Sequence, residues 1–261
     1  MGWALITGAS SGMGLEYARQ LAAGGHDILL VSNQQEQLIQ VTADIVDEFG
    51  VNAVPRYEDL SSEAAAQNLL EWTLEAGYEV DTLICNAGMF FFKELRPENM
   101  SLVETMIQLH VATNTRLCIL FGNEMKRRGT GSILIVSSMV ASLPAPGIAI
   151  YSASKAYLKN FGKSLHYEMK PYGVKVTTVC PGAVATPLYR LKPSIMKLGV
   201  KAGVIWTPQR LVRRALNALH QGRTCIKPGF MNIWLPLAFD MLPPSAESRA
   251  WNICIRKGLG K

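Results

Sequence analysis

Short apolar runs alternate with longer segments of helical periodicity along most of the chain. Runs of this kind are typical of strands that lie buried in a parallel sheet. They cover Trp3 to Thr7, Ile28 to Val31, Asn52 to Tyr57, Thr82 to Cys85, Ser132 to Val136, Val174 to Cys180 and Thr224 to Ile226. Because helical segments separate the runs, the pattern predicts an α/β fold, in which a doubly wound parallel sheet carries helices on both faces.

No linker rich in Pro, Gly or Ser divides the sequence, and no internal repeat interrupts it. We therefore expect one domain over residues 1–261. Residues 187–206 follow the sixth apolar run, and their pattern predicts a substrate loop that contains a short helix. Residues 228–261 form an apolar C-terminal extension with three prolines, Pro236, Pro243 and Pro244.

The longest helical patterns run from Ser101 to Lys126 and from Tyr151 to Tyr172. Ser101 followed by Glu104 is typical of a capping box, which predicts that the first of these helices begins there. Thr207 before Pro208 predicts a further helix start, because threonine caps free N–H groups and proline fits the first helical position.

A glycine cluster follows the first predicted strand directly, with the spacing GxxxGxG. Glycine allows positive φ and close approach of a ligand to the backbone, and a helix N-terminus presents N–H groups to an anion. Such a cluster alone also fits a tight turn, but its place after an N-terminal strand favours a dinucleotide pyrophosphate site. The residues assigned to this site are Gly8, Ser10, Ser11, Gly12, Met13 and Gly14.

Ser32 and Asn33 follow the second predicted strand, where a site that prefers NAD(H) usually carries an acid for the ribose hydroxyls. Ser32 removes that repulsion toward a 2′-phosphate. No Lys or Arg stands beside it to attract the phosphate. The sequence therefore favours NADP(H) and leaves NAD(H) open.

The third and fourth strands end in further polar candidates. Asp59 and Leu60 follow the third strand, and the carboxylate can accept from adenine or serve as the acid at a helix start. Asn86, Ala87 and Gly88 follow the fourth strand, where they place polar backbone against the same cofactor or form a plain turn.

Ser138, Tyr151 and Lys155 are the candidate catalytic residues. Tyr151 and Lys155 are four residues apart and share one helix face, so the ammonium can lower the phenol pKa from its usual value of about 10. A tyrosine tuned in this way can donate a proton to a developing alkoxide, while a serine hydroxyl holds the carbonyl oxygen. The alternative is a surface pair on a helix.

In combination, these motifs resemble those of the short-chain dehydrogenase/reductase family, and they span residues 3 to about 227. The motifs are TGASSGMG, NAG, a serine thirteen residues before a tyrosine, YSASK and the stretch from Pro181 to Thr186. The resemblance implies a Rossmann-type domain with seven strands. It implies that Gly8, Gly12 and Gly14 bind the pyrophosphate, that Asp59 meets the adenine, and that Asn86, Pro181, Gly182, Val184 and Thr186 line the cofactor, with Thr186 near the carboxamide.

The same resemblance implies a catalytic role for each of the three candidates. Tyr151 would be the acid/base, Lys155 would bind the nicotinamide ribose, and Ser138 would bind the substrate oxygen. One position departs from the family. A pattern that usually ends Leu-Asn-Val around a catalytic asparagine here reads Leu109-His110-Val111.

Three readings of this departure stay open. Asn114, one turn later on the same helix face, can supply the missing amide. His110 can itself carry protons from Lys155 to water. Alternatively, His110 is a packed helix residue and the relay runs through water.

The chain most resembles the reductases of 3-oxoacyl thioesters and hydroxysteroids, from Ile28 to Gln37, around YSASK and from Lys227 to Asn232. Aromatic and apolar residues are expected on the pocket side, although such residues more often pack in a core. They are Phe90, Phe91, Phe92, Met196, Trp206, Phe230, Met231 and Trp234.

We expect an oxidoreductase that transfers hydride between NADP(H) and a carbonyl or secondary alcohol on a lipophilic substrate, which is a 3-oxoacyl thioester, a steroid or a lipid ketone. The alternative is an NADPH-binding redox-sensing regulator without turnover.

Charge is segregated along the chain. The net charge is +6, yet the stretch between Met169 and Phe239 has no Asp or Glu and eleven Lys or Arg, so the rest is net negative. This fits an anionic partner such as a CoA or carrier-protein thioester, or a solvated face. No motif supports nucleic acid binding. The family resemblance suggests a homodimer or homotetramer.

Cysteine and hydropathy patterns bear on location. Five cysteines without CxxC spacing predict buried free thiols, and four scattered histidines suggest no metal site. No run of 18 apolar residues occurs, so we expect a cytoplasmic protein. In the extension, apolar residues from Trp234 to Leu242 precede Arg249, Arg256, Lys257 and Lys261, which fits peripheral membrane contact, subunit packing or a pocket lid.

Overall fold

The computed structural model describes residues 2–186 and 193–229, without the side chains of residues 193–195. Beyond residue 229 it describes only Asn232, Trp234, Leu235, Ala238, Met241, Ser245, Ala246, Ser248, Arg249 and Asn252. Residues 187–192 of the predicted substrate loop and most of the C-terminal extension lie outside these residues. Phe230, Met231 and most of the tail residues proposed for membrane contact are among those outside.

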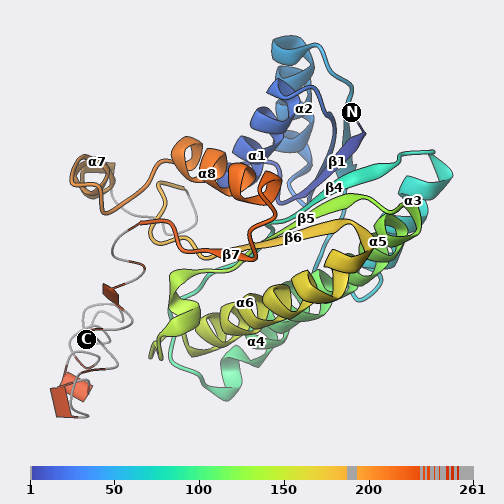
Figure 1. Cartoon of the computed structure of the whole chain (residues 1–261). Coiled ribbons are helices and arrows are strands. Elements are labelled where there is room, and N and C mark those ends of the chain that lie inside the picture. Colours follow the sequence, from blue (N-terminus) through green and yellow to red (C-terminus); the bar gives the residue numbers. More distant parts are fainter. Residues whose placement is uncertain are drawn as a thin grey trace.

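Seven parallel strands form one sheet in the order β3-β2-β1-β4-β5-β6-β7, which confirms the predicted fold class (Figure 1). Each predicted apolar run is a strand whose ends differ from the prediction by at most two residues. The strands are β1 (Trp3–Thr7), β2 (Asp27–Ser32), β3 (Ala53–Tyr57), β4 (Val80–Cys85), β5 (Gly131–Val136), β6 (Val174–Val179) and β7 (Cys225–Ile226).

Helices cover both faces of the sheet, because alternate strand residues point to opposite sides. Ala4 and Ile6 face one core cluster, and Leu5 faces the other. The first cluster lies under α1 (Gly12–Ala23), α2 (Gln35–Phe49) and α8 (Pro208–His220). The second lies under α3 (Ala65–Glu75), α5 (Asn114–Arg128) and α6 (Ala149–Met169). Two further α-helices in the described residues are α4 (Met100–Ile107) and α7 (Pro193–Lys201).

The two predicted helix starts have different outcomes. Thr207 caps α8, since its side chain accepts a hydrogen bond from the Arg210 N–H at 3.4 Å. The capping box at Ser101 is wrong. A 3₁₀ turn, η1 (Pro97–Asn99), leads directly into α4, so Ser101 already lies inside the helix and its carbonyl accepts from the Thr105 hydroxyl.

The segment predicted as one helix from Ser101 to Lys126 contains a π-helical stretch, η2 (Gln108–Thr113), between α4 and α5. A π turn holds more residues than an α turn, so it changes which side chains share a face. Asn114 therefore does not lie where α-helical spacing from His110 places it. Further 3₁₀ turns are η3 (Met139–Ser142) and η4 (Lys170–Tyr172).

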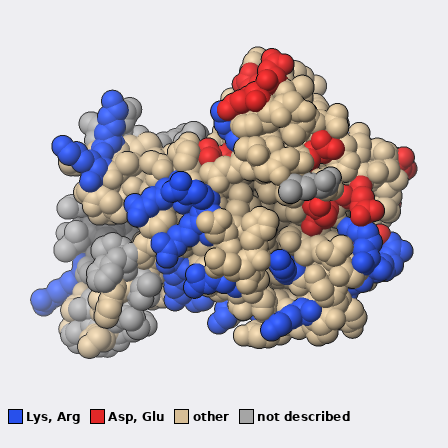
Figure 2. Space-filling view, turned by 45° about the horizontal axis from the view of Figure 1, so that its top comes forward, with Lys and Arg blue, Asp and Glu red and all other residues tan. Residues whose placement is uncertain are grey.

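Surface charge is unevenly distributed (Figure 2). On the side that carries α7 and α8 the charged side chains are mostly blue, whereas the red ones gather on the other side, where blue side chains lie beside them. The exposed Lys and Arg side chains of the stretch between Met169 and Phe239 include Lys201, Arg210, Arg213, Arg214 and Arg223. Arg190 and Lys192 lie outside the described residues. None of the helices in the described part of the chain has the length and hydrophobicity that crossing a membrane requires.

Candidate active site

A cleft of about 910 Å³ opens at the carboxyl ends of the strands. The strand order reverses between β1 and β4, and ligands of doubly wound sheets bind at such a reversal. The volume of the cleft is at the upper end of the range for small-molecule sites. Of the predicted site residues, the cleft is lined by Gly8, Ser10, Ser11, Gly12, Met13, Ser32, Asn33, Asp59, Leu60, Asn86, Ala87, Gly88, Ser138, Tyr151, Lys155, Pro181, Gly182, Val184 and Thr186.

The glycine loop between β1 and α1 has the backbone that the sequence pattern requires. Gly8 and Gly12 have φ values of 67° and 57°, a region that disfavours other residues. Gly14 lies behind the loop, outside the cleft lining, and a Cβ atom there would lie 1.9 Å from the Gly8 carbonyl oxygen. Gly14 thus brings helix and loop together instead of facing a ligand.

The N-terminus of α1 points into this loop. Ser11 is the N-cap residue, and no described side chain caps the helix there. The first N–H groups of α1 are therefore available to an anion, and the helix dipole favours a negative charge at this end. The arrangement fits a pyrophosphate.

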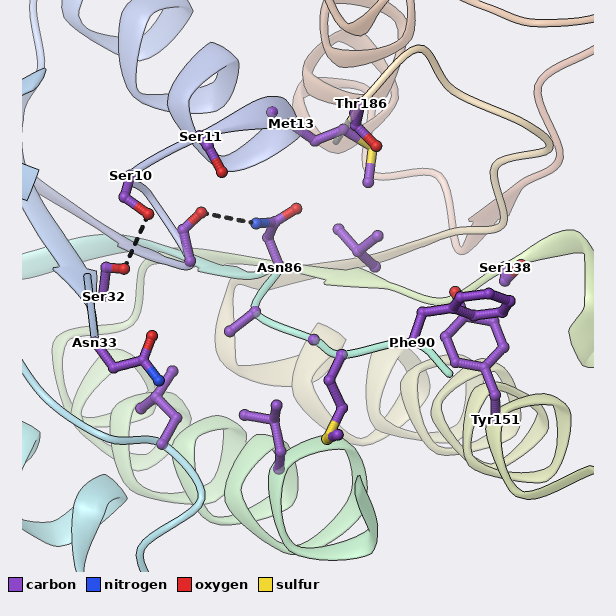
Figure 3. Close-up of a pocket in the computed structure, with 18 of the residues that line it drawn as sticks. Ser10, Ser11, Met13, Ser32, Asn33, Asn86, Phe90, Ser138, Tyr151 and Thr186 are labelled. Carbon is purple, nitrogen blue, oxygen red and sulfur yellow. Dashed lines mark hydrogen bonds between the residues drawn. The ribbon is translucent and has the colours of Figure 1, made fainter. Parts of the chain in front are cut away.

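A chain of neutral hydroxyl and amide groups lines one end of the cleft (Figure 3). Ser32 Oγ donates to Ser10 Oγ at 3.0 Å, and Ser10 Oγ donates to Gln34 Oε1 at 3.1 Å. The Gln34 N–H in turn donates to Ser32 Oγ. Ser32 is buried, so this chain fixes its hydroxyl at the end of β2.

Two carboxylates lie beyond this hydroxyl chain, at the end of β3. Asp59 Oδ1 accepts from the Ser61 N–H at 3.0 Å and from its hydroxyl at 2.7 Å. Glu58 accepts from the Asn68 amide and pairs with Arg56 at 3.5 Å. Both acids line the cleft, and Arg56 does not.

Asn86 ties the end of β4 to the glycine loop. Its amide donates to the carbonyl oxygens of Thr7 at 3.0 Å and Gly8 at 3.4 Å (Figure 3). The Thr7 hydroxyl accepts from the N–H groups of Asn86 and Ala87. Asn86 therefore holds the two strand ends at a fixed separation across the sheet reversal.

Tyr151 and Ser138 lie together at the opposite end of the cleft from Ser10 and Ser32 (Figure 3). The Tyr151 ring packs edge-on against Phe90, with ring centroids 5.1 Å apart. Ser138 lies two residues beyond the end of β5 and caps η3, since its hydroxyl accepts from the Val140 N–H. These contacts hold the phenol and the serine hydroxyl on rigid elements.

Lys155 reaches the same end from α6. The side chain is buried, and its Nζ donates to the Val136 carbonyl oxygen at 3.1 Å and lies 5.6 Å from the centre of the Tyr151 ring. Burial lowers the pKa of Lys155 to about 8. Its ammonium is therefore close enough to neutrality to gain or lose a proton near physiological pH.

His110 has hydrogen-bond partners at both ring nitrogens. Nε2 accepts from the Met89 N–H at 3.0 Å, which leaves the proton of the neutral ring on Nδ1. Nδ1 lies 2.9 Å from Ser154 Oγ, and that hydroxyl donates to the Tyr151 carbonyl oxygen. Burial, and then the charge of Lys155, hold the pKa of His110 well below its usual value.

Gly88 makes room for this arrangement. A Cβ atom on Gly88 would lie 2.9 Å from His110 Nε2 and 3.7 Å from Lys155 Nζ. His110 and Lys155 thus approach the same short stretch of backbone from two sides. The buried, neutral imidazole favours the reading of His110 as a packed residue, because Nε2 is already occupied by the Met89 N–H.

Asn114 does not reach the cleft. Its amide donates to the carbonyl oxygens of Leu109 at 2.9 Å and His110 at 3.0 Å, which stabilises the π turn. The reading in which Asn114 supplies the missing amide therefore lacks the required geometry.

Of the aromatic residues expected on the pocket side, Phe90, Phe91 and Phe92 line the cleft. Trp206 does not. It packs against the core under α8, with the Arg210 guanidinium 4.3 Å from its ring centre. Met196 and Trp234 are also absent from the described lining.

Sequence reasoning missed several lining residues, among them Gln34, Glu58, Ser61, Met89, Thr105, Leu109, Val136 and Ser137. Gln34, Glu58 and Ser137 follow the carboxyl ends of β2, β3 and β5 closely. Position alone was therefore a usable signal, since all parallel strands end at the same edge. Thr105 and Leu109 carried no such signal.

The model of the short chain dehydrogenase family matches residues 2–194. The chain belongs to this family. Similar proteins include the very-long-chain 3-oxoacyl-CoA reductase of Anas platyrhynchos, which is 31% identical over 252 residues, 93% of this chain and 76% of that protein. The protein of the same name from Homo sapiens is 33% identical over 229 residues, 85% of this chain and 70% of that protein.

Solved structures agree with this assignment. The short-chain dehydrogenase from Sphingobium yanoikuyae in complex with NADPH matches with a TM-score of 0.79 and 28% identity, over 91% of this chain and 92% of that chain. A structure that addresses 7beta-hydroxysteroid dehydrogenase stereoselectivity has a TM-score of 0.85 at 23% identity and 96% coverage of both chains, and supports the fold. This short-chain dehydrogenase is therefore an oxidoreductase that uses a nicotinamide cofactor on carbonyl or alcohol groups.

The contacts of His110 predict how this dehydrogenase responds to substitution there. His110→Asn should keep activity within about fivefold, because an amide oxygen can accept from the Met89 N–H. His110→Leu leaves that partly buried N–H without its acceptor, at a cost of about 1 kcal/mol, and should weaken cofactor binding. Steady-state kinetics and cofactor titration of both variants check this. Collapse of activity in folded His110→Asn would show a role that only histidine can fill.

Proposed function

We propose that this dehydrogenase uses NADPH to reduce the 3-oxo group of a long-chain acyl thioester. The observation that carries the proposal is the shared position of Ser138 and Tyr151 beside Phe90, at one end of the cleft. Proton-donating groups and an apolar wall thus meet at one place, as reduction of a ketone on a lipophilic chain requires. The names of the similar reductases support the same substrate class.

The residues of the cleft fit a dinucleotide. An uncapped helix N-terminus, a positive-φ glycine loop and a hydroxyl chain follow one another from Gly12 to Ser32. When bound, the cofactor supplies the hydride. The glycine loop and Asn86 would hold the middle of the dinucleotide, around its pyrophosphate. Lys155 would lie at the ribose next to the nicotinamide.

The chain itself supplies the proton and the alignment. The Tyr151 hydroxyl donates a proton to the carbonyl oxygen as negative charge develops there. The Ser138 hydroxyl donates a hydrogen bond to the same oxygen and fixes its position. The Lys155 ammonium stabilises the phenolate that remains on Tyr151. Phe90, Phe91 and Phe92 exclude water beside the reacting carbon.

A preference for NADP(H) is supported by the end of β2. Ser32, not an acid, lies there, and its neutral hydroxyl, held by Ser10, places no negative charge against a 2′-phosphate. The NADPH complex of the Sphingobium yanoikuyae relative supports the same choice. Glu58 and Asp59 line the cleft nearby, and no Arg or Lys other than Lys155 stands in the described lining, so the preference is moderate.

Ser32→Asp tests this preference. A carboxylate at this buried position repels the 2′-phosphate, so the Kd of NADPH should rise about tenfold or more relative to that of NADH. Fluorescence titration of both cofactors measures the ratio. Ser32→Ala is the matched control, since it removes the hydroxyl without adding charge. An unchanged ratio in Ser32→Asp would place the 2′-phosphate elsewhere.

The basic side of the molecule supports an anionic substrate head. Val184 lines the cleft and pairs in a parallel bridge with Trp206, on which the Arg210 guanidinium lies. The first cationic side chain of α8 therefore lies close to the cleft, where it can attract the phosphate groups of a CoA thioester. The substrate loop over residues 187–206 would cover the acyl chain.

A substrate series tests the proposal. NADPH oxidation is followed with 3-oxoacyl-CoA thioesters of increasing chain length, with the corresponding pantetheine thioesters and with steroid ketones. We expect kcat/KM to rise with chain length and to fall when the CoA phosphates are removed. Preference for short-chain or steroid ketones would contradict the substrate class while leaving the reductase chemistry intact.

A further inference from the structure

Two cysteine pairs lie in the described part of the chain, and their surroundings differ. The Sγ atoms of Cys180 and Cys225 are 3.9 Å apart, and those of Cys85 and Cys118 are 3.8 Å apart. Cys85 and Cys118 are sealed in the core between β4 and α5. Cys225 is only partly buried, which departs from the expectation that all cysteines are buried, and Cys254 lies outside the described residues.

The charges of three lysine side chains act on Cys225. Lys159 and Lys163 project from α6, and Lys227 follows β7. None of the three forms an ion pair with an acid among the described residues. Their positive charge is therefore available to stabilise a thiolate.

The two thiols of this pair have opposite tendencies to ionise. The hydrogen bond from Cys180, and then the three lysines, lower the pKa of Cys225. The hydrogen bond to Cys225, and then burial, raise the pKa of Cys180. An accessible thiolate beside a protonated thiol is the arrangement of a reactive cysteine and its resolving partner.

We propose that Cys180 and Cys225 are an oxidation site, in which hydrogen peroxide converts the two thiols to a disulfide that weakens cofactor binding. The Cys225 thiolate attacks the peroxide, the O–O bond breaks, and hydroxide leaves and is protonated to water. The sulfur is oxidised to a sulfenic acid. The Cys180 thiol then attacks this sulfur, the S–O bond breaks, and a second water leaves. In total, two thiols and one hydrogen peroxide give one disulfide and two waters.

A disulfide requires the two sulfur atoms to approach to about 2.05 Å, so one strand has to move. Among the described residues, β7 is a two-residue strand at the edge of the sheet and pairs with β6 alone. Such a strand can move more easily than the central strands.

Movement of Cys180 reaches the cleft through its chain neighbours. Pro181 and Gly182 follow it directly and line the cleft, and the Pro181 carbonyl accepts from the Met139 N–H. Ser137 also contacts the Cys180 thiol and donates to the Lys155 carbonyl oxygen at 2.6 Å. A new bond at Cys180 therefore shifts two segments of the cofactor site.

Peroxide treatment of the full chain with peptide mapping tests the proposal. We expect a Cys180–Cys225 cross-link that dithiothreitol reverses, and free thiols at Cys85 and Cys118, whose equal separation makes them the internal control. In Cys180→Ser the Cys225 sulfenic acid should persist and react with dimedone. In Cys225→Ser the Cys180 thiol should stay reduced.

Cofactor titration of the oxidised protein completes the test. We expect the Kd of NADPH to rise about fivefold on oxidation and to recover on reduction, with no such change in Cys225→Ser. Oxidation first at Cys85 or Cys118, absence of the Cys180–Cys225 cross-link, or a cross-link that leaves the Kd unchanged would overturn the proposal. Folding of both serine variants is checked by circular dichroism.

Discussion

Tyr151→Phe should lower kcat for ketone reduction by about 10³-fold and leave the Kd of the cofactor nearly unchanged. The substitution removes only the hydroxyl. The ring keeps its edge-on contacts with Phe90 at 5.1 Å and with His110 at 5.7 Å, so the packing of α6 is retained. The loss of kcat then measures the effect of removing the proton donor to the carbonyl oxygen.

Tyr157→Phe is the control for this variant. Tyr157 lies on the same helix, bonds to the Thr115 hydroxyl at 2.9 Å and stacks on Phe161. Loss of its hydroxyl should leave kcat within about twofold, because the hydrogen bond lies away from the cleft and is worth about 1 kcal/mol to stability. Equal losses in both variants would assign the effect to helix stability and not to chemistry.

Lys155→Met should also reduce kcat/KM by about 10³-fold, since it removes the charge that stabilises the phenolate. Methionine is apolar and can fill the buried volume without leaving an unpaired charge. Lys159→Met, one helical turn further along α6, is the control and should stay within about twofold of the wild type. In addition, only Lys155→Met should weaken cofactor binding.

The pH dependence of kcat/KM distinguishes the effect of the Lys155 charge from the effect of its side-chain packing. Burial lowers the pKa of Lys155 to about 8, so its ammonium is present below that pH and is lost above it. For the wild type, kcat/KM of reduction should therefore fall as the pH rises through about 8. In Lys155→Met the profile should lose this fall. A wild-type profile that rises through the same range would contradict the role assigned to the ammonium.

Much of the fold was predictable because parallel strands are buried on both faces. Runs such as Ile28 to Val31 then contain no polar alternation, and the glycine loop after β1 marks where the first crossover begins. The helix start at Ser101 was mispredicted, because the turn from Pro97 to Asn99 begins the helix before the capping pattern does.

The π turn could not be predicted, because one added residue per turn leaves no distinct pattern of side chains. Its effect on the site is large, since the Asn114 amide bonds to the carbonyl oxygens of Leu109 and His110 within the turn and not to a group in the cleft. The partners of His110 were equally hidden: Met89 is 21 residues away and Ser154 is 44 residues away in sequence. Only the folded chain shows that the imidazole accepts from the Met89 N–H and lies beside the Ser154 hydroxyl.

The cysteine pair illustrates the same limit. Cys180 and Cys225 are 45 residues apart, and their sulfur atoms meet because β6 and β7 pair in parallel at the sheet edge. Sequence spacing without CxxC correctly excluded a local motif but carried no information on this contact. By contrast, the order Ser138, Tyr151, Lys155 predicted that these three residues lie in one cleft, because a strand end and one helix hold all three.

Transfer of deuterium tests the central claim most directly. The protein is incubated with a long-chain 3-oxoacyl-CoA and with NADPH that carries deuterium at C4, each of the two C4 epimers in turn, and the product is analysed by mass spectrometry. The account predicts a 3-hydroxyacyl-CoA with one deuterium at C3 from one epimer only, and its loss in Tyr151→Phe. Tight NADPH binding without deuterium in any ketone of the substrate series would contradict the account and would indicate a nucleotide-binding regulator.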